Sequence, residues 1–598
     1  MNIRYLLPAF AIAAALPACA HQTSAPAEAQ TVEAPATLAD IVDDYEALVL
    51  LDSPSAAARA ENQAARRWSD VSDLHVSHMA DRARHLKMRL DALDDHTAPE
   101  WAILSHLLDQ MIAAETFDTA RIPFTGDWGF HAEPFFAARS LKLKSADDAD
   151  AWIARLYDVP RYFADHTTNM RRGVSNGWTA HTDPLGTTIE QVREQVVDMP
   201  EDSPLWAPFE DLPDTISDED AVAIRRSGRQ AVSAAIGAYA DLLAYLETEY
   251  LPHARAEPGV VTLSGGRPYY AQEIKTHTAG AGYSPSEIHE LGLSEVARIR
   301  AEMEIIIEEL GYPGTFDEFL NFLRTDPQFY SETPEDLLEK AARISKRLDA
   351  ILPQYFGKLP RLTYGVEPVP DAIAPGYTTG RYAGGDPEKG VSGTYLVNTY
   401  ALDQRPLYEL PALSAHEAVP GHHLQISLAQ ELEDVSRFRK QYYATAFGEG
   451  WGLYAEKLAG EAGIYQTPYE RFGQLSYEMW RACRLVADTG MHWYGWSREE
   501  AEACFTDNSA LAPLNIKTEV TRYIGWPGQA TAYKMGELKI LELRQTARDA
   551  LGEDFDIRAF HDELLGAGSL PLDALEVRIK AWIERQLSVD EPEPTVPA

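Results

Sequence analysis

Three histidines and a glutamate lie close together in the segment LSAHEAVPGHHLQ, Leu413 to Gln425. His416 is followed directly by Glu417, and His422 and His423 come just after a Pro–Gly pair. Imidazole nitrogens and carboxylate oxygens are the usual ligands of catalytic zinc, which keeps one position for water. A glutamate beside such a ligand can take the proton of that water. The segment therefore predicts a catalytic metal site, with an ordinary histidine-containing loop as the alternative.

The spacing of the histidines excludes an undisturbed helix. His422 is six positions after His416, which turns it roughly 120° away, and His423 is seven positions on, about 10 Å farther along the axis. Pro420 cannot donate a hydrogen bond to the carbonyl of His416, and Gly421 allows almost any backbone angle. We therefore predict a bulge that absorbs the surplus residues. The smaller distortion favours His422 as the second ligand and leaves His423 to orient a ligand or face the substrate.

A third ligand is available in the segment FGEGWGLYAEKLAG, Phe447 to Gly460. Glu449 lies between two glycines, which would let another helix approach closely. Glu456 comes seven residues later and so lies on the same helical face. We predict that Glu449 binds the metal and that Glu456 orients one of the histidines.

The elements that must position these residues read mainly as helices, from about Ala39 to Leu587. Ser284 and Glu287 are spaced as a capping box at a helix start, and Thr333 with Asp336 repeats the pattern. We expect two halves. Residues 39–258 form an N-terminal helical half, and residues 259–598 form the catalytic half that carries the metal site.

Two short segments ahead of the histidines are predicted strands, Arg361–Val369 and Gly393–Tyr400. The second could be an edge strand that pairs with an extended peptide, with Asn398 as a backbone contact.

Further candidates lie downstream of the metal ligands. Asp488 and His492 are spaced so that, on a helix, the carboxylate could orient the imidazole, although a purely structural contact fits equally well. Arg522 and Lys534 could neutralise a substrate carboxylate, although solvated basic residues are the commoner case.

Composition and charge limit the possible functions. The 598 residues are 45% hydrophobic and 24% charged, as in globular proteins. A net charge of −39 argues against nucleic acid as a partner, because phosphate binding needs clustered Lys and Arg. The sequence does not indicate an oligomeric state.

The N-terminus predicts export. Residues 1–18 read as a signal peptide, with Arg4 ahead of an apolar stretch too short to span a bilayer. The sequence LPAC, Leu16 to Cys19, resembles a lipoprotein cleavage box in which Cys19 carries the lipid. Residues 19–38 read as a flexible tether. We expect a periplasmic or outer-membrane lipoprotein of a Gram-negative bacterium that touches the membrane only through Cys19, with simple secretion as the alternative.

Cys483 and Cys504 would then be an even pair in an oxidising compartment. They could form a disulfide, but we favour two buried free thiols in neighbouring helices.

Four segments resemble the signature segments of the bacterial domain-of-unknown-function family 885, which is grouped with the zincin-like (gluzincin) metallopeptidases. They are HEAVPGHHLQ, GEGWGLYAEKL, RLVADTGMHWYGWSREEA and RYIGWPGQATAYKMGELKI. Two upstream segments, SPSEIHELGLSEVARI and NMRRGVSNGWTA, also match, so that the resemblance covers nearly the whole mature chain. It implies a mainly α, two-lobed fold with a small β-sheet next to the metal-binding helix and a deep central channel.

The wider superfamily implies roles for individual residues. GEGWGLYAE is similar to the aminopeptidase helix whose glutamate binds zinc, which supports Glu449. The Gly–His order at His422 is similar to that in thimet-oligopeptidase-like and Taq-type carboxypeptidases. Such enzymes stabilise the oxyanion with tyrosines or a histidine well after the zinc glutamate, where this chain has Tyr523, Tyr533 and His492. The long spacing between the histidines departs from the superfamily pattern.

The resulting hypothesis is an exported peptidase with one Zn²⁺ ion that cleaves small or unstructured peptides. Glu417 would act as the base, and Tyr533, in preference to Tyr523, would donate a hydrogen bond to the oxyanion. One alternative is a non-catalytic peptide-binding lipoprotein, although such a protein has no need of a base at Glu417. Another is a metal-dependent hydrolase of a non-peptide amide or ester.

Overall fold

The computed structural model describes residues 37–126, 128–371, 374–433 and 435–589. The expected signal peptide and Cys19 lie outside these residues. Of the expected tether, the last two positions are described, and they already belong to a helix start, because Thr37 caps the helix that begins at Leu38. No helix in the described ranges is both long and apolar enough to cross a membrane.

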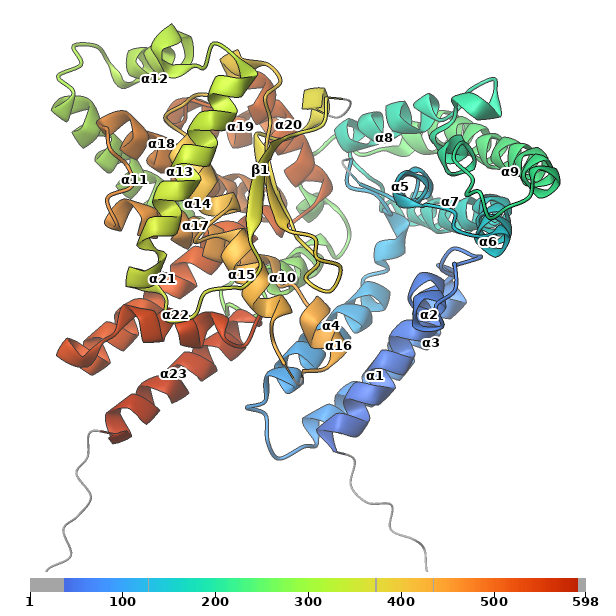
Figure 1. The fold of residues 1–598 in the computed structure, drawn as a ribbon, viewed down its shortest axis with the longest axis horizontal. Coiled ribbons are helices and arrows are strands. Elements are labelled where there is room, and N and C mark those ends of the chain that lie inside the picture. The colour runs from blue at the N-terminus through green and yellow to red at the C-terminus, as the bar shows by residue number, and fades with distance from the viewer. Residues whose placement is uncertain (1–36, 127, 372–373, 434, 590–598) are drawn as a thin grey trace, which may run out of the picture.

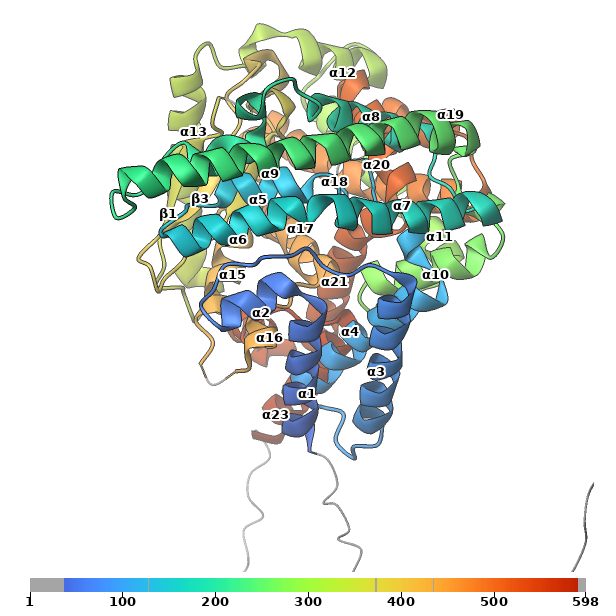
Figure 2. The same cartoon turned by 90° about the vertical axis from the view of Figure 1, so that its right-hand side faces the viewer.

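The N-terminal part consists of helices (Figure 1). Their bounds are α1 Leu38–Asp52, α2 Pro54–Ala60, α3 Asp73–Asp91, α4 Pro99–Thr116, α5 Glu133–Ser140, α6 Ala146–Tyr157, α7 Val159–Asn176, α8 Thr182–Glu194 and α9 Asp218–Tyr245. Helices α6, α7 and α9 lie side by side across one face of the molecule (Figure 2). Together with α5 and α8 they enclose an apolar core of their own.

The remaining helices belong to the part of the chain that carries the predicted site. Their bounds are α10 Gly266–His277, α11 Pro285–Glu309, α12 Phe316–Thr325, α13 Pro334–Tyr355, α14 Leu410–Glu417, α15 His422–Gln430, α16 Arg437–Gln441, α17 Thr445–Glu461, α18 Pro468–Thr489, α19 Arg498–Asn508, α20 Pro513–Gly525, α21 Ala532–Leu551, α22 Ile557–Leu565 and α23 Leu572–Val589. The predicted start of α11 is confirmed, since Ser284 and Glu287 form a reciprocal capping box. Thr333 caps α13 as predicted, whereas the Asp336 side chain pairs with Lys340 and does not complete a capping box.

The apolar cores do not divide the chain at Pro258. Helices α1, α3 and α4 share one continuous core with α14, α17 and α21, for example through Ile41, Leu104 and Trp451. The separate N-terminal core is formed by Trp68 together with residues between Phe124 and Tyr250. The first helices therefore belong structurally to the part of the molecule that carries the candidate site.

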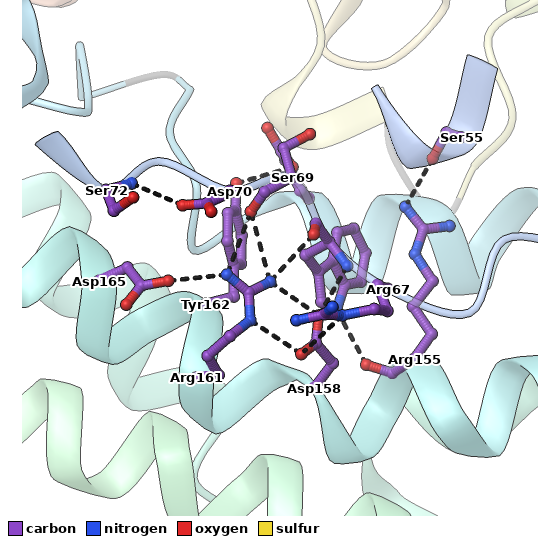
Figure 3. Close-up of polar contacts among 12 residues, drawn as sticks. Ser55, Arg67, Ser69, Asp70, Ser72, Arg155, Asp158, Arg161, Tyr162 and Asp165 are labelled. Carbon is purple, nitrogen blue, oxygen red and sulfur yellow. Dashed lines mark hydrogen bonds and ion pairs between the residues drawn. The ribbon is translucent and has the colours of Figure 1, made fainter. Parts of the chain in front are cut away.

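The linker between α2 and α3 ties these two parts together (Figure 3). Arg161 of α7 forms ion pairs of 2.7 Å with Asp158 and Asp165 and donates hydrogen bonds to the backbone carbonyls of Trp68 and Ser69. The Trp68 amide donates to Asp158 at 2.8 Å. These contacts anchor the linker on α7.

The small sheet has three strands in the order β1-β3-β2, where β1 is Tyr364–Pro368, β2 is Gly380–Ala383 and β3 is Gly393–Val397. Strand β3 pairs in parallel with β1 and antiparallel with β2. The sheet packs beside α13, α14 and α15 (Figure 1). The prediction that Gly393–Tyr400 is an edge strand is therefore wrong, because both edges of β3 are already paired.

Asn398 does not offer its side chain to a substrate, which corrects the second part of that prediction. It is fully buried, and its amide nitrogen donates to the backbone carbonyls of Ala374, Tyr377 and Thr378. Its side-chain oxygen accepts a hydrogen bond from the Tyr400 amide. Asn398 thus fixes the loop that leads into β2.

Cys483 and Cys504 form a disulfide between α18 and α19, with a Cα–Cα distance of 5.7 Å. This corrects the expectation of two free thiols. The two helices bring the Cα atoms within the range that a disulfide requires.

Lys534 lies in a cage of carboxylates behind the site. Its ammonium is fully buried and lies 2.7 Å from Glu478, 2.7 Å from Glu537 and 3.0 Å from Glu295. These residues come from α21, α18 and α11. The proposed role of Lys534 in substrate binding is therefore wrong, because this side chain joins the three helices.

Replacing Lys534 with Met should lower the free energy of unfolding by about 3–5 kcal/mol, since the buried Glu537 loses its cation while Glu478 and Glu295 retain Arg298. Urea denaturation followed by circular dichroism measures the shift. Lys340→Met is the matched control, because Lys340 pairs with Asp336 on the surface and exposed pairs contribute little. Equal unfolding midpoints for the two variants would contradict this role of the cage.

Candidate metal centre

The chain leaves the helical path between His416 and His422. Helix α14 ends at Glu417, residues 418–421 form a turn with a cis bond between Val419 and Pro420, and α15 begins at His422. The predicted bulge within one helix is therefore corrected to a complete break. Ala418 and Gly421 have ψ angles of −111° and −130°, far from helical values.

Gly421 is required for the close passage of this turn over α14. A Cβ at this position would overlap the backbone carbonyl oxygen of His416. The Trp451 indole of α17 donates a 2.8 Å hydrogen bond to the carbonyl of Pro420. The turn is thus held from both sides, by α14 below it and by α17 beside it.

His416, His422 and Glu449 converge as the sequence predicts. One nitrogen of each imidazole and one carboxylate oxygen all lie within 4.8 Å of one another. The Glu449 oxygen is 3.4 Å from Nε2 of His416 and 3.7 Å from Nε2 of His422. Two ligands bound tetrahedrally to zinc at its usual bond lengths are separated by about 3.3 Å. The set of two histidines and one glutamate, with this spacing, could hold a metal ion such as zinc.

The carboxylates and imidazoles of the cluster stabilise one another's charges. Burial lowers the pKa of His416, but contacts with Glu449 and Glu456 outweigh it and raise that pKa to about 10. Burial also opposes the ionisation of Glu449, yet the two imidazoles hold its pKa well below the usual range. Nδ1 of His416 lies 2.8 Å from Glu456, which is almost fully buried. Glu456 therefore leaves Nε2 of His416 as the nitrogen that faces Glu449.

Glu417 lies beside the cluster and is held by the sheet. One of its carboxylate oxygens accepts a 2.7 Å hydrogen bond from the Tyr382 amide of β2. In an antiparallel ladder a backbone group that is not bonded to the partner strand points outward, so this amide lies on the edge of β2 that faces away from β3. The carboxylate thus lies at the edge of the sheet, and Glu417 directly follows the predicted ligand His416.

His423 points away from the cluster. Its ring nitrogens lie 3.0 Å from the Tyr382 hydroxyl and 3.1 Å from the carbonyl of Leu362. Burial lowers its pKa to about 4. The expectation that His423 orients a ligand or faces the substrate is corrected, because this side chain joins α15 to the sheet.

The glycines that flank Glu449 have separate functions. Gly450 packs against Gly536, which brings α17 and α21 into the close contact that the sequence predicts. Gly448 instead leaves room for the Tyr443 ring, because a Cβ there would overlap its hydroxyl oxygen. Tyr443 therefore lies next to Glu449. The residue remains 44% exposed.

Sequence reasoning missed Tyr443. Burial, followed by the nearby carboxylate of Glu449, raises the pKa of its hydroxyl, and Tyr533 and Glu417 contribute in the same direction. These groups thus act electrostatically on the Tyr443 hydroxyl. The only signal in the sequence is the position of Tyr443 a few residues before Glu449, which does not reveal how the intervening chain folds back.

The two predicted tyrosines differ in their surroundings. Tyr533 is half-buried, contributes to the field at Tyr443, and has the Arg484 guanidinium 4.4 Å from its ring centre. The Tyr523 hydroxyl is buried and donates to Glu519 at 2.7 Å while it accepts from Arg484 at 2.9 Å. Tyr523 is corrected from a catalytic to a structural residue, because its hydroxyl is fully engaged.

Arg522 lies beside these groups on α20. Its guanidinium is 3.2 Å from Glu519 and also donates to Gln529. These contacts place Arg522 in a charge network within the protein.

Asp488 and His492 do not pair, which corrects another prediction. Nε2 of His492 is 3.0 Å from the carbonyl of Tyr523, and its Nδ1 accepts from the Val260 amide at 3.2 Å. Asp488 accepts hydrogen bonds from the Tyr270 hydroxyl and the Gly528 amide. Burial lowers the pKa of His492 to about 3, so that it remains neutral and structural. The chain also changes from α- to π-helix at Gly490–Tyr494, which alters the predicted spacing.

Comparisons with known proteins cover nearly the whole chain. The model of the family described as "Bacterial protein of unknown function (DUF885)" matches residues 54–579. A crystal structure of a "putative lipoprotein" from Colwellia psychrerythraea is 25% identical, with a TM-score of 0.83 over 92% of this chain and 100% of that one. A "putative lipoprotein of unknown function" from Shewanella oneidensis is 17% identical, with a TM-score of 0.73 over 93% and 100%. No curated protein matches the chain.

Replacing Glu456 with Gln should weaken zinc binding by about 10- to 100-fold, because His416 loses the carboxylate that fixes its orientation. Competition with a chromogenic zinc chelator measures the affinity. Glu461→Gln, on the same helix but paired with Arg544, is the control and should bind zinc like the wild type. Unchanged affinity in Glu456→Gln would show that His416 needs no such support.

Proposed function

The chain belongs to the DUF885 family of bacterial proteins, and we propose that it is a zinc-dependent peptidase that hydrolyses small or unstructured peptides. The observation that carries the proposal is the convergence of His416, His422 and Glu449 beside a further carboxylate, Glu417. Three protein ligands of this kind with a neighbouring general base are typical of hydrolytic zinc sites. A relation to the zincin-like peptidases is part of this proposal.

His416, His422 and Glu449 would hold the zinc ion. When bound, zinc lowers the pKa of a water molecule and polarises a carbonyl group. Glu417 would take the proton of that water and pass it to the leaving amine. The Tyr382 amide supports this role because it fixes one carboxylate oxygen and leaves the other available.

We assign the oxyanion contact to Tyr443 together with Tyr533. Both side chains are partly exposed, and both Glu449 and Tyr533 act electrostatically on the Tyr443 hydroxyl. A tyrosine hydroxyl can donate a hydrogen bond to the negative charge that develops on the carbonyl oxygen. Tyr523 cannot take this part, since its hydroxyl already donates to Glu519.

The free edge of β2 is the place where an extended peptide would bind. It takes over the role predicted for the segment Gly393–Tyr400, since β2 forms one edge of the sheet and its Tyr382 amide touches Glu417. Pairing with an exposed strand edge uses only backbone groups and so accepts many sequences. This mode suits an enzyme that acts on unstructured peptides.

Two other functions remain as alternatives to the proposal. A peptide-binding lipoprotein without turnover could use the same strand edge, but it would not need the carboxylate of Glu417 next to the metal ligands. A hydrolase of a non-peptide amide or ester could use the same residues. Which substrates the protein hydrolyses, peptides or non-peptide amides and esters, distinguishes this second alternative from a peptidase.

We also propose that the protein is exported and held in the periplasm or at the outer membrane by lipid on Cys19. The sequence LPAC supports this. Two solved structures with the same fold, both of proteins described as a "putative lipoprotein", support it as well.

Replacing Glu417 with Gln should leave zinc binding unchanged and lower peptide hydrolysis by about 10²- to 10⁴-fold, because the base is removed while the ligands remain. A quenched-fluorescent peptide library and an ester panel measure activity, and metal analysis measures zinc content. Glu388→Gln, on the exposed loop between β2 and β3, is the matched control. Equal cleavage by Glu417→Gln and the wild type would contradict the role of Glu417. A zinc-loaded wild type that cleaves neither peptides nor esters would favour the binding protein.

A further inference from the structure

A cavity of about 290 Å³ lies where the N-terminal helices meet the end of α20. Helix α8 lies beside α20 in this region (Figure 1). The wall combines aromatic residues, Trp178, Tyr269 and Trp526, with the polar residues Arg255 and His181. This volume is close to the lower limit for cavities that bind small ligands, about 300 Å³.

Arg255 is a cation without a carboxylate partner among the described residues. Its guanidinium donates to the backbone carbonyls of Glu257, Pro258 and Ile524. Its Nε is buried and has no partner. Burial lowers the pKa of Arg255 to about 10. Buried charges are normally paired, so an arginine that borders a cavity in this state offers a binding place for an anion.

The acidic residues of the cavity wall do not fill this place. The Asp118 carboxylate accepts a 2.8 Å hydrogen bond from Arg172 and lies 3.3 Å from Arg121. Glu273 lies 3.5 Å from the imidazole of His277. Both carboxylates are engaged elsewhere, so the charge of Arg255 is left for a ligand.

The aromatic residues select the rest of the ligand. Trp178 and Tyr269 meet edge to face, with their ring centres 5.3 Å apart, and the Trp178 indole is fixed by a 2.8 Å hydrogen bond to Ser264. Trp526 belongs to the same wall and remains 38% exposed. Rigid aromatic walls favour a flat or large apolar group next to the anion.

A second cavity of about 380 Å³ adjoins the first, because Gln110 and Thr276 belong to the walls of both. Tyr443 belongs to the wall of the second cavity. Tyr443 also packs on Gly448, next to the metal ligand Glu449. The two cavities thus lie next to each other, one bordered by Arg255 and the other by Tyr443, which packs beside Glu449.

We propose that the cavity at Arg255 binds the carboxy-terminal residue of the substrate, with the carboxylate on Arg255 and an aromatic or large apolar side chain against Trp178 and Trp526. This rests on the proposed peptidase function, from which it takes the identity of the ligand as a peptide. The main chain of the substrate would pass Gln110 and Thr276 on its way to the metal centre. The protein would therefore prefer peptides with a free carboxy terminus.

Binding is tested first, on zinc-free full-length protein, with N-acetylphenylalanine and with its neutral amide as probes. Isothermal titration calorimetry should give an affinity at least about 10-fold higher for the acid, a difference that corresponds to one charge-assisted contact. Arg255→Met and Trp526→Ala should each lower the affinity for the acid, and Arg255→Met should abolish the difference between the probes. Trp128→Ala, an exposed tryptophan outside the cavity, should bind as the wild type does.

Hydrolysis is tested second, with peptides that end in phenylalanine or in phenylalanine amide. The ratio of kcat/KM should favour the free acid about 10-fold in the wild type and fall several-fold in Trp526→Ala, a variant that keeps all contacts of Arg255. Equal binding of the two probes, or an unchanged preference in both cavity variants, would overturn the proposal. Selective binding of the acid without cleavage of any peptide would instead refute the peptidase function and support the carboxylate site.

Discussion

The candidate site depends on one constraint on the backbone, which is that the chain must leave the helix after Glu417 and start a new one at His422. Only this break lets two imidazoles six positions apart face the same point. The turn is possible because Gly421 has no Cβ to strike the carbonyl of His416. It is held in place because the Trp451 indole binds the carbonyl of Pro420.

Helix α17 joins this turn to the rest of the molecule. The same helix provides Glu449 at the cluster, Trp451 at the turn and Glu456 behind His416. The close contact of Gly450 with Gly536 fixes the position of α17 against α21. Helix α21 is held in turn by the buried charges around Lys534. Buried ion clusters contribute little net stability but penalise any other arrangement of the helices. The position of the metal ligands is therefore linked to packing far from the site.

Local signals in the sequence predicted much of this arrangement. Helix starts such as Ser284 depend on neighbouring residues, and the ligand set followed from the chemistry and spacing of His416, His422 and Glu449. The sequence could not reveal properties that depend on distant partners. Strand β2 consists of only Gly380–Ala383 in a glycine-rich segment, so the central place of β3 was hidden. The partners of His492 and the approach of Tyr443 likewise come from segments that only the tertiary fold brings together.

Zinc binding by the two neighbouring histidines tests the central claim most directly. Purified wild type, His422→Ala and His423→Ala are loaded with zinc, dialysed and analysed for metal content and affinity. The account predicts one tightly bound zinc ion in the wild type and in His423→Ala, and a loss of tight binding in His422→Ala. Zinc retained by His422→Ala but lost from His423→Ala, or no tight site in the wild type, would contradict it.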